Sequence, residues 1–238
     1  RALDLAAETV TTLAGLAETA GGDDGVGADA RFNGPEALAL TSDGSQLYVA
    51  DRGNSTIRAI EVASGTVSTL AGVAGEQGDD DGVGADARFR SPAALALTSD
   101  GSRLYVGQFN FFATVVREVV LESGAVTTLT GQPGESGVGD GTLDEARFSG
   151  IRDVLISPAG DLLVADFQNS LVRRIDLGAG MVDTFLGDPA IEGNIPAGTR
   201  WPLDDATLLF PMALARAGND LLILAEDAVL IARPEGTW

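Results

Sequence analysis

The sequence contains no histidine, no cysteine and no lysine, so all 15 of its basic residues are arginines. Without cysteine the chain has no disulfide, no zinc–thiolate site and no thiol nucleophile. Without histidine, a Ser-His-Asp triad and a His-ligated metal are excluded. Without lysine, Schiff-base chemistry and a Walker-type phosphate loop are excluded as well. These absences remove most of the common catalytic and metal-binding constellations.

Positive charge is also scarce. The 35 acidic residues outnumber the bases and give a formal net charge of −20 over 238 residues. Nucleic-acid binding draws most of its affinity from a basic face, and anionic membranes attract basic segments. The most apolar stretch, residues 221–232, is interrupted by Glu226 and Asp227, so no run approaches a membrane span. We therefore expect neither a nucleic-acid partner nor insertion into a membrane.

An acidic, glycine-rich phrase occurs three times. It reads "GDDGVGADARF" at 22–32, "DDDGVGADARF" at 79–89 and "GDGTLDEARF" at 139–148. A second landmark, "TLAG" at 12–15 and 69–72, returns as "TLTG" at 128–131 and "TFLG" at 184–187. Such self-similarity marks a repeat architecture. Since "RALDLAAETVTTLAG" matches "RAIEVASGTVSTLAG" at 58–72, we expect the chain to begin inside a repeat of a larger protein.

Each repeat predicts four short strands. In the best-defined repeat they fall at 36–41, 46–51, 56–62 and 66–72, with turn signals such as "SDGS" between them. Four antiparallel strands per repeat describe a blade of a β-propeller. We expect an all-β chain forming a single propeller domain, with three complete blades and a partial blade at each end. The blade parts are 1–15, 30–72, 87–131, 146–187 and 206–238. A closed four-bladed ring and a fragment of a five- or six-bladed propeller both fit this pattern.

Residues 30–72 resemble an NHL repeat. The resemblance lies in Phe–x–x–Pro before the first strand, "LYVAD" on the second, and Asn followed by Ile-Arg at the third. It covers nearly the whole chain and weakens after residue 190. It implies a non-catalytic protein–protein interaction or scaffold module that binds other proteins or further domains of its own assembly. It also implies a place in a larger extracellular or lumenal assembly, at the cell surface or in fibres. The alternative is a propeller hydrolase or lyase that uses a carboxylate-bound Ca²⁺. RNA binding, which some NHL propellers perform, would need a basic face.

The acidic phrases offer the candidate metal ligands. In a propeller the links between blades share a face with the turns between strands two and three, and Ca²⁺ prefers clustered carboxylate oxygens. The candidates are Asp23, Asp24, Asp79, Asp80, Asp81 and Asp140. The competing interpretation is structural, because Asp-Gly favours turns and Arg31, Arg88 and Arg147 can pair with loop carboxylates. Apart from a possible Ca²⁺ we expect no cofactor.

Two residue pairs recur at the turn between strands two and three. They are Asp51 with Asn54, and Asp166 with Asn169. A catalytic centre is normally unique, whereas these pairs repeat, so we interpret them as structural and assign no catalytic residue.

Two features break the repeat and are candidate partner contacts. The segment "QFNFFA" at 108–113 places Phe109, Phe111 and Phe112 in an expected surface turn, and Trp201 lies in the irregular "TRWPLDD". Asn54 also begins the sequon "NST", which makes it a glycosylation candidate. A glycan there would place the protein in the secretory route.

Overall fold

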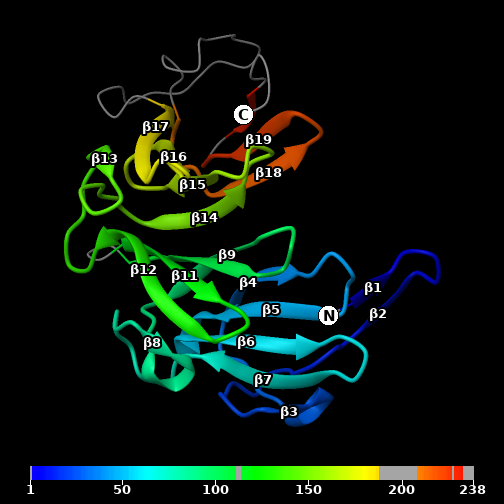
Figure 1. Ribbon diagram of the computed structural model, residues 1–238. Helices are drawn as coiled ribbons and strands as arrows, with labels where there is room; N and C mark the ends of the chain where they lie inside the picture. The colour runs from blue at the N-terminus through cyan, green and yellow to red at the C-terminus, as the bar shows by residue number, and fades with distance from the viewer. Residues whose placement is uncertain (1, 111–113, 188–207, 227, 233–238) are drawn as a thin grey trace. The chain divides into compact units, whose positions relative to one another are not determined.

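The computed structural model describes residues 2–110, 114–187, 208–226 and 228–232 (Figure 1). Apart from three short 3₁₀ turns, the regular structure in these ranges consists of β-strands. The chain divides into two compact units. Unit 1 comprises Arg1–Pro92, Leu97–Leu104 and Val119–Thr127, and unit 2 comprises Ala93–Ala96, Tyr105–Glu118 and Thr128–Trp238.

The first complete blade is an antiparallel sheet in unit 1 with the order β3-β7-β6-β5-β4. Its strands are β3 (Gly25–Val26), β4 (Pro35–Leu40), β5 (Gln46–Asp51), β6 (Thr56–Glu61) and β7 (Thr66–Ala71). Two 3₁₀ turns accompany it, η1 (Gly27–Asp29) and η2 (Arg52–Asn54). Four of these strands lie where the repeat predicts them. The fifth, β3, is the Gly-Val of the acidic phrase, and it pairs with the outermost strand through Gly25↔Val67 and Val26↔Thr66.

The second and third sheets repeat this order. The second runs β8-β12-β11-β10-β9 and the third runs β13-β17-β16-β15-β14. The second contains β8 (Gly82–Val83), β9 (Pro92–Leu97), β10 (Arg103–Gln108), β11 (Thr114–Val120) and β12 (Ala125–Gln132), with η3 (Gly84–Asp86). The third contains β13 (Gly141–Thr142), β14 (Ile151–Ile156), β15 (Leu162–Asp166), β16 (Leu171–Asp176) and β17 (Met181–Leu186). Each acidic phrase therefore adds a two-residue strand to the outer edge of the blade that follows it.

Smaller sheets lie near the two ends of the described chain. The hairpin of β1 (Ala2–Asp4) and β2 (Thr9–Thr11) forms a two-stranded sheet in unit 1. In unit 2, β18 (Ala213–Ala217), β19 (Asp220–Leu224) and β20 (Val229–Ala232) form a three-stranded antiparallel sheet.

The tight turn between the first two strands of a blade explains why "TSDGS" recurs. Asp43 accepts hydrogen bonds from the Thr41 hydroxyl at 2.6 Å and from the Ser45 amide at 3.0 Å. Asp100 makes the same two contacts, with Thr98 and Ser102. These bonds, the threonine hydroxyl first, lower the pKa of both carboxyls to about 2. The following glycine takes a left-handed φ of 73° at Gly44, which a side chain would disfavour.

Apolar faces of successive sheets form the core of unit 2. Phe148, which ends the third acidic phrase, is fully buried in a cluster that contains both Ala94 and Tyr105 of the second sheet and Val154 of the third. This phenylalanine packs between two sheets. On the other face of the third sheet, Leu163 and Val172 pack with Leu214 and Ile223 of the last sheet. No helix in the described ranges is long and apolar enough to cross a membrane.

Candidate functional site

Each complete blade buries one arginine on its third strand. Arg58, Arg117 and Arg173 are the largest side chains that are fully buried in the described structure. A buried guanidinium is costly unless carboxylates and carbonyls surround it. In the two blades described below, these partners come from the preceding acidic phrase and from the end of the second strand.

In the first blade, Arg58 joins the acidic phrase to the turn after β5. Its Nη2 donates to Asp24 Oδ1 at 2.7 Å and to the Asp23 carbonyl at 3.0 Å. Its Nη1 donates to Asp51 Oδ2 at 3.1 Å and to the Arg31 carbonyl at 2.9 Å. The guanidinium also lies over the ring of Phe32, 5.2 Å from its centroid. The last phenylalanine of the phrase therefore covers the buried charge.

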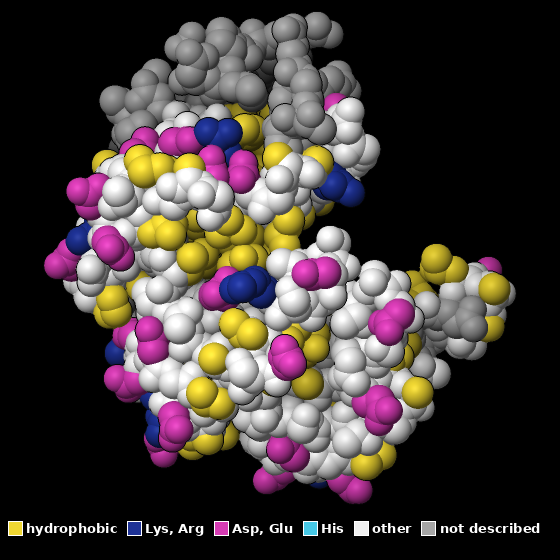
Figure 2. Space-filling model, in the orientation of Figure 1, with side chains coloured by type: hydrophobic (Ala, Val, Ile, Leu, Met, Phe, Trp, Pro, Cys, Tyr) yellow, Lys and Arg dark blue, Asp and Glu magenta, His cyan; other side chains and the backbone are white. Residues whose placement is uncertain are grey.

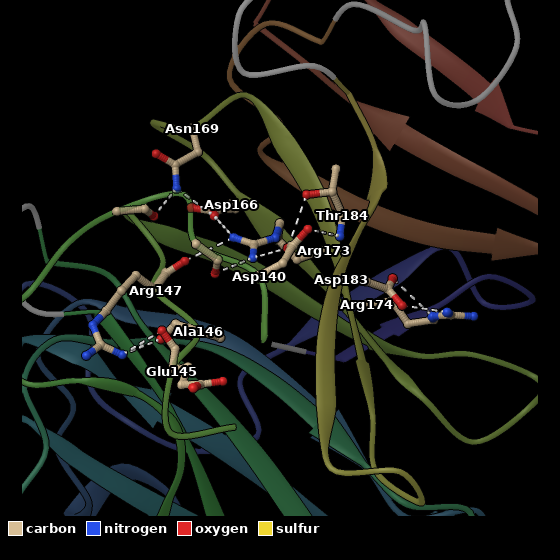
Figure 3. Close-up of polar contacts among 12 residues, drawn as sticks. Asp140, Glu145, Ala146, Arg147, Asp166, Asn169, Arg173, Arg174, Asp183 and Thr184 are labelled. Carbon is tan, nitrogen blue, oxygen red and sulfur yellow. Dashed lines mark hydrogen bonds and ion pairs between the residues drawn. The ribbon is translucent and has the colours of Figure 1, made fainter. Parts of the chain in front are cut away.

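The third blade repeats this network (Figure 3). Arg173 donates to Asp166 Oδ2 at 3.2 Å, to Asp140 Oδ1, and to the carbonyls of Gly139 and Arg147. Its guanidinium lies 5.1 Å from the centroid of the Phe148 ring. Because the same network occurs in each unit, we conclude that it is part of the repeat.

Asp51 and Asp166 are held by three donors each. Asp51 accepts from the Asn33 amide at 2.7 Å and from Asn54 Nδ2 at 2.6 Å, in addition to Arg58. Asp166 accepts from the Ser149 amide at 2.7 Å and from Asn169 Nδ2 at 2.8 Å, in addition to Arg173. Both carboxylates are fully buried. These hydrogen bonds fit the structural interpretation of the recurring Asp and Asn pairs.

Burial dominates the electrostatics of these carboxyls. It raises the pKa of Asp51, and it raises the pKa of Asp166 to about 6, although hydrogen bonds and the nearby arginine oppose the shift. In the second blade the corresponding residue is Gln108, which is neutral and also buried. The repeat therefore tolerates an uncharged hydrogen-bonding side chain at this position.

The candidate metal ligands lie in ion pairs or loops of this network. Asp24 and Asp140 pair with Arg58 and Arg173, and Asp79 pairs with Arg90 at 3.1 Å. Within the described ranges, no group of three or more acidic side chains is placed to hold a metal ion. On the face drawn in Figure 2, acidic side chains are scattered rather than gathered. Binding of Ca²⁺ by the set that also includes Asp23, Asp80 and Asp81 stays a prediction.

The arginines of the three acidic phrases make two kinds of contact, ion pairs with loop carboxylates and hydrogen bonds to backbone carbonyls. Arg88 pairs with Glu76 at 2.7 Å and Arg147 pairs with Glu135 at 2.9 Å, so the expected pairing with loop carboxylates is confirmed there. All three arginines also donate to backbone carbonyls of their own phrase, as Arg31 does to those of Ala28 and Ala30.

The structure corrects the glycosylation candidate. Asn54 is 6% exposed, and its Nδ2 donates to the Gly21 carbonyl and to Asp51 Oδ2, both at 2.6 Å. An N-linked glycan is attached through this nitrogen, so it would break the pair of bonds and require space that the fold fills. Asn169, which lies outside any sequon, makes the equivalent bonds to Gly137 and Asp166. Asn54 is therefore a structural residue of the turn.

The structure also corrects the surface position expected for Phe109. Its side chain is 7% exposed and meets Phe167 edge-on, with ring centroids 5.9 Å apart. The guanidinium of Arg152 lies over the Phe109 ring at 4.2 Å and near the Phe167 ring at 5.5 Å. Phe210 adds a third ring, 5.0 Å from Phe167. We call Phe109, Phe167, Phe210 and Arg152 the aromatic cluster. Phe111, Phe112 and Trp201 lie outside the described residues.

Sequence reasoning missed two parts of the site. It did not single out Arg58 and Arg173, although an arginine after a β-branched residue, Ile57 or Val172, was visible on the third strand of both repeats. It also missed Asp153, which stands where the first two repeats have Ala37 and Ala94. Asp153 accepts the Leu214 amide of the last sheet at 2.7 Å and the amide of Val154 at 2.9 Å. Burial raises the pKa of Asp153 to about 6.

Comparison with known proteins gives relatives of the same repeat type, and no family model matches the chain. The chain is 32% identical over 158 residues to protein SUPPRESSOR OF QUENCHING 1, chloroplastic, of Arabidopsis thaliana, which is 63% of this chain and 14% of that protein. It is 28% identical over 188 residues to human NHL repeat-containing protein 2, which is 70% of this chain and 26% of that protein. The chain thus spans about a quarter or less of the length of these relatives.

Solved structures share the fold at low identity. A chain of the nidogen/laminin complex matches with a TM-score of 0.60 at 12% identity, covering 86% of this chain and 61% of that one. A candidate gluconolactonase matches with a TM-score of 0.54 at 15% identity, covering 85% of this chain and 61% of that one. At such identities the likeness concerns the fold alone.

The sheets and these likenesses define a β-propeller fold whose complete blades have four antiparallel strands and a two-residue strand at the outer edge. The acidic phrase, its phenylalanine and the buried arginine recur in each complete blade. The chain is an NHL-repeat propeller, as the relatives named for that repeat also indicate.

Proposed function

We propose that the chain is a non-catalytic protein–protein interaction module within a larger extracellular or lumenal assembly. The observation that carries the proposal is the aromatic cluster, in which arginine and phenylalanine side chains from separate repeats of unit 2 meet. Arginine and aromatic residues are enriched in protein interfaces. Phe167 and Phe210 keep part of their surface accessible, so they can meet a partner without refolding.

The repeated carboxylates support the non-catalytic part of the proposal. Asp51 and Asp166, which are both fully buried, each have three donors within the protein. A general acid or base needs access to substrate, whereas these groups face the interior of their own repeat. A fold relative from a nidogen/laminin complex is consistent with a role in protein assembly.

The test uses purified chain and its native partner, identified by chemical cross-linking in the source organism. We expect Phe210→Ser to weaken the association at least tenfold, or about 1.4 kcal/mol, as expected for an interface hot spot. Phe111→Ser and Trp201→Ala extend the test to the other candidate contacts. Val138→Ser, at a 48% exposed side chain in a link, is the matched control.

Two results would contradict the proposal. The first is association unchanged in all three contact variants whose thermal stability matches that of the wild type. The second is Ca²⁺-dependent turnover of a lactone or ester by the purified chain, which would favour the hydrolase or lyase alternative. Calorimetric titration with Ca²⁺ at micromolar concentration separates ion binding from catalysis.

A further inference from the structure

Each acidic phrase contains a short segment that covers the outer edge of its blade. We call residues 23–27, 80–84 and 139–143 the edge segments. Each contributes a two-residue strand, β3, β8 or β13, and the residue after that strand donates its amide to the turn before the outermost strand (Figure 1). The pairs are Gly27 with the Gly65 carbonyl at 2.9 Å, Gly84 with Gly124 at 3.0 Å and Leu143 with Gly180 at 3.2 Å. The edge segment therefore takes the place at which another strand could add.

One carboxylate extends this cover beyond the two paired residues. Asp24 Oδ2 accepts the Thr69 amide at 3.1 Å, while its Oδ1 accepts the Thr69 hydroxyl at 3.0 Å and a hydrogen bond from the buried arginine. In the third blade, Asp140 Oδ2 accepts the Thr184 amide at 3.2 Å, and its Oδ1 binds the arginine there (Figure 3). The amides of Thr69 and Thr184 thus point outward from β7 and β17, toward the edge segment.

The outermost strand of the first blade carries neither charge nor proline. This strand, β7, reads TVSTLA, and the chain as a whole contains no lysine. Native edge strands are commonly protected by charged side chains, particularly lysine, by proline, or by a segment that covers them. Uncharged segments of high β-propensity and about this length pair with other chains when they are exposed. Protection of this edge therefore depends on the edge segment.

Little burial holds the edge segments in place. Val26 and Val83, the apolar residues of β3 and β8, are 53% and 55% exposed, whereas Val67 of β7 is 2% exposed. The side chains of Asp24 and Asp140 are 51% and 47% exposed. A segment that buries little apolar surface and is held by exposed hydrogen bonds opens at a lower free energy than the sheet beneath it. We therefore expect the edge segment to be less stable than the blade that it covers.

We infer that the edge segment of the first blade is a cover that opens before the blade unfolds, and that the opened edge pairs with the same edge of a second copy of the chain. Opening frees the outward amide of Thr69, which then finds an acceptor in the second copy. Two identical edges that pair antiparallel form a closed twofold dimer. Opening takes Asp24 away from Arg58, but Arg58 keeps its bond to Asp51, so the buried charge retains one carboxylate. The inference goes beyond the proposed interaction function, because the aromatic cluster takes no part in it.

Gly27→Pro is the variant that opens this cover. Gly27 has a φ of 55°, which proline cannot adopt, and proline has no amide to donate to Gly65. Light scattering should show that the mass of this variant rises with concentration to about twice that of the wild type. Gly134→Pro is the matched control, because Gly134 has a φ of 84° in a link but lies outside the edge segments. The control should keep the wild-type mass.

A second substitution identifies the surface of association. Thr69→Pro removes the amide that donates to Asp24, outward from the sheet, and edge strands accept proline at such positions. The chain that carries both Gly27→Pro and Thr69→Pro should therefore return to the wild-type mass. Association that survives in this double variant overturns pairing through the edge of β7.

Hydrogen exchange of the wild-type chain tests the opening step even if Gly27→Pro fails to fold. At low urea concentration, the amides of Gly27 and Thr69 should exchange together. Their exchange should be at least about tenfold faster than that of the Ile60 amide in β6, a difference of about 1.4 kcal/mol in opening free energy. Equal exchange at the three amides would mean that the edge segment opens only when the blade unfolds, and it would overturn the inference. A folded Gly27→Pro variant with the wild-type mass would overturn it as well.

Discussion

Replacing Arg173 with methionine tests whether the buried network stabilises the fold. The substitution preserves most of the side-chain volume but removes the partner of Asp166, and both side chains are fully buried. Removing one member of a buried ion pair typically costs about 3–5 kcal/mol, because the remaining charge is left without compensation. For a chain of this size, the midpoint of thermal unfolding should fall by roughly 6–20 °C.

The matched control is the next residue in the sequence. Arg174 pairs with Asp183 at 2.6 Å, but their side chains are 41% and 43% exposed. Exposed pairs of this kind contribute about 0–1 kcal/mol. Arg174→Met should therefore have a small effect, and the comparison shows the cost of losing a charge that is buried and held by several partners.

Urea denaturation at pH 5 and at pH 8 tests whether the loss of stability depends on the charge of Asp166. Burial already raises the pKa of Asp166 to about 6, and removal of Arg173 raises it further. Protonation of Asp166 then removes its uncompensated charge, so the loss in free energy of unfolding should be smaller at pH 5 than at pH 8. The double variant with Asp166→Leu should recover part of the stability. Equal losses for Arg173→Met and Arg174→Met, or a loss independent of pH, would refute the reasoning.

Three further predictions concern single residues. Because burial raises the pKa of Asp153 to about 6, the folded state holds a proton that the unfolded state releases. The contribution of Asp153 to the free energy of unfolding should therefore fall as pH rises from about 4 to about 6, and Asp153→Asn should remove this slope in urea titrations. Expression in a glycosylating host should leave Asn54 unmodified by mass spectrometry, and Asn54→Ala should cost about 1–3 kcal/mol in urea; full occupancy would contradict the hydrogen bonding. Gly131→Ala should lower the thermal midpoint more than Gly134→Ala. Both have left-handed φ, 88° and 84°, but only at Gly131 would a Cβ approach a backbone oxygen, Thr114 O, at 2.4 Å.

Repetition made the blades predictable from the sequence. Alternating apolar residues and turn residues returned at each period, so one well-defined repeat placed the strands of the others. The two-residue strand β3 was missed because Gly25 and Val26 have no alternating pattern of their own. Their pairing with Val67 and Thr66 depends on a link that folds back across the whole blade.

The partners within the site were harder to predict. Asp24 and Arg58 are 34 residues apart, and their contact depends on that same folded link. Phe109 was expected at the surface because its turn is longer than in other repeats. It is buried because Arg152 and Phe167 cover it, and neither residue is close in sequence. The sequon at Asn54 predicted N-linked glycosylation, which the hydrogen bonds of the turn do not permit.

Each acidic phrase folds back to the outer edge of the blade that follows it. This limits which segments can be duplicated or exchanged, in evolution or in design, without separating buried charges. The hydrogen-bond partners of Arg58 described above lie between residues 23 and 51, and those of Arg173 lie between 139 and 166. A duplicated or exchanged segment that starts before the phrase and ends after the fourth strand carries its whole set of charges with it. Boundaries drawn at the first strand would instead separate a buried arginine from its carboxylate. The segment that keeps each buried arginine together with its carboxylates therefore begins in the link between blades, before the acidic phrase.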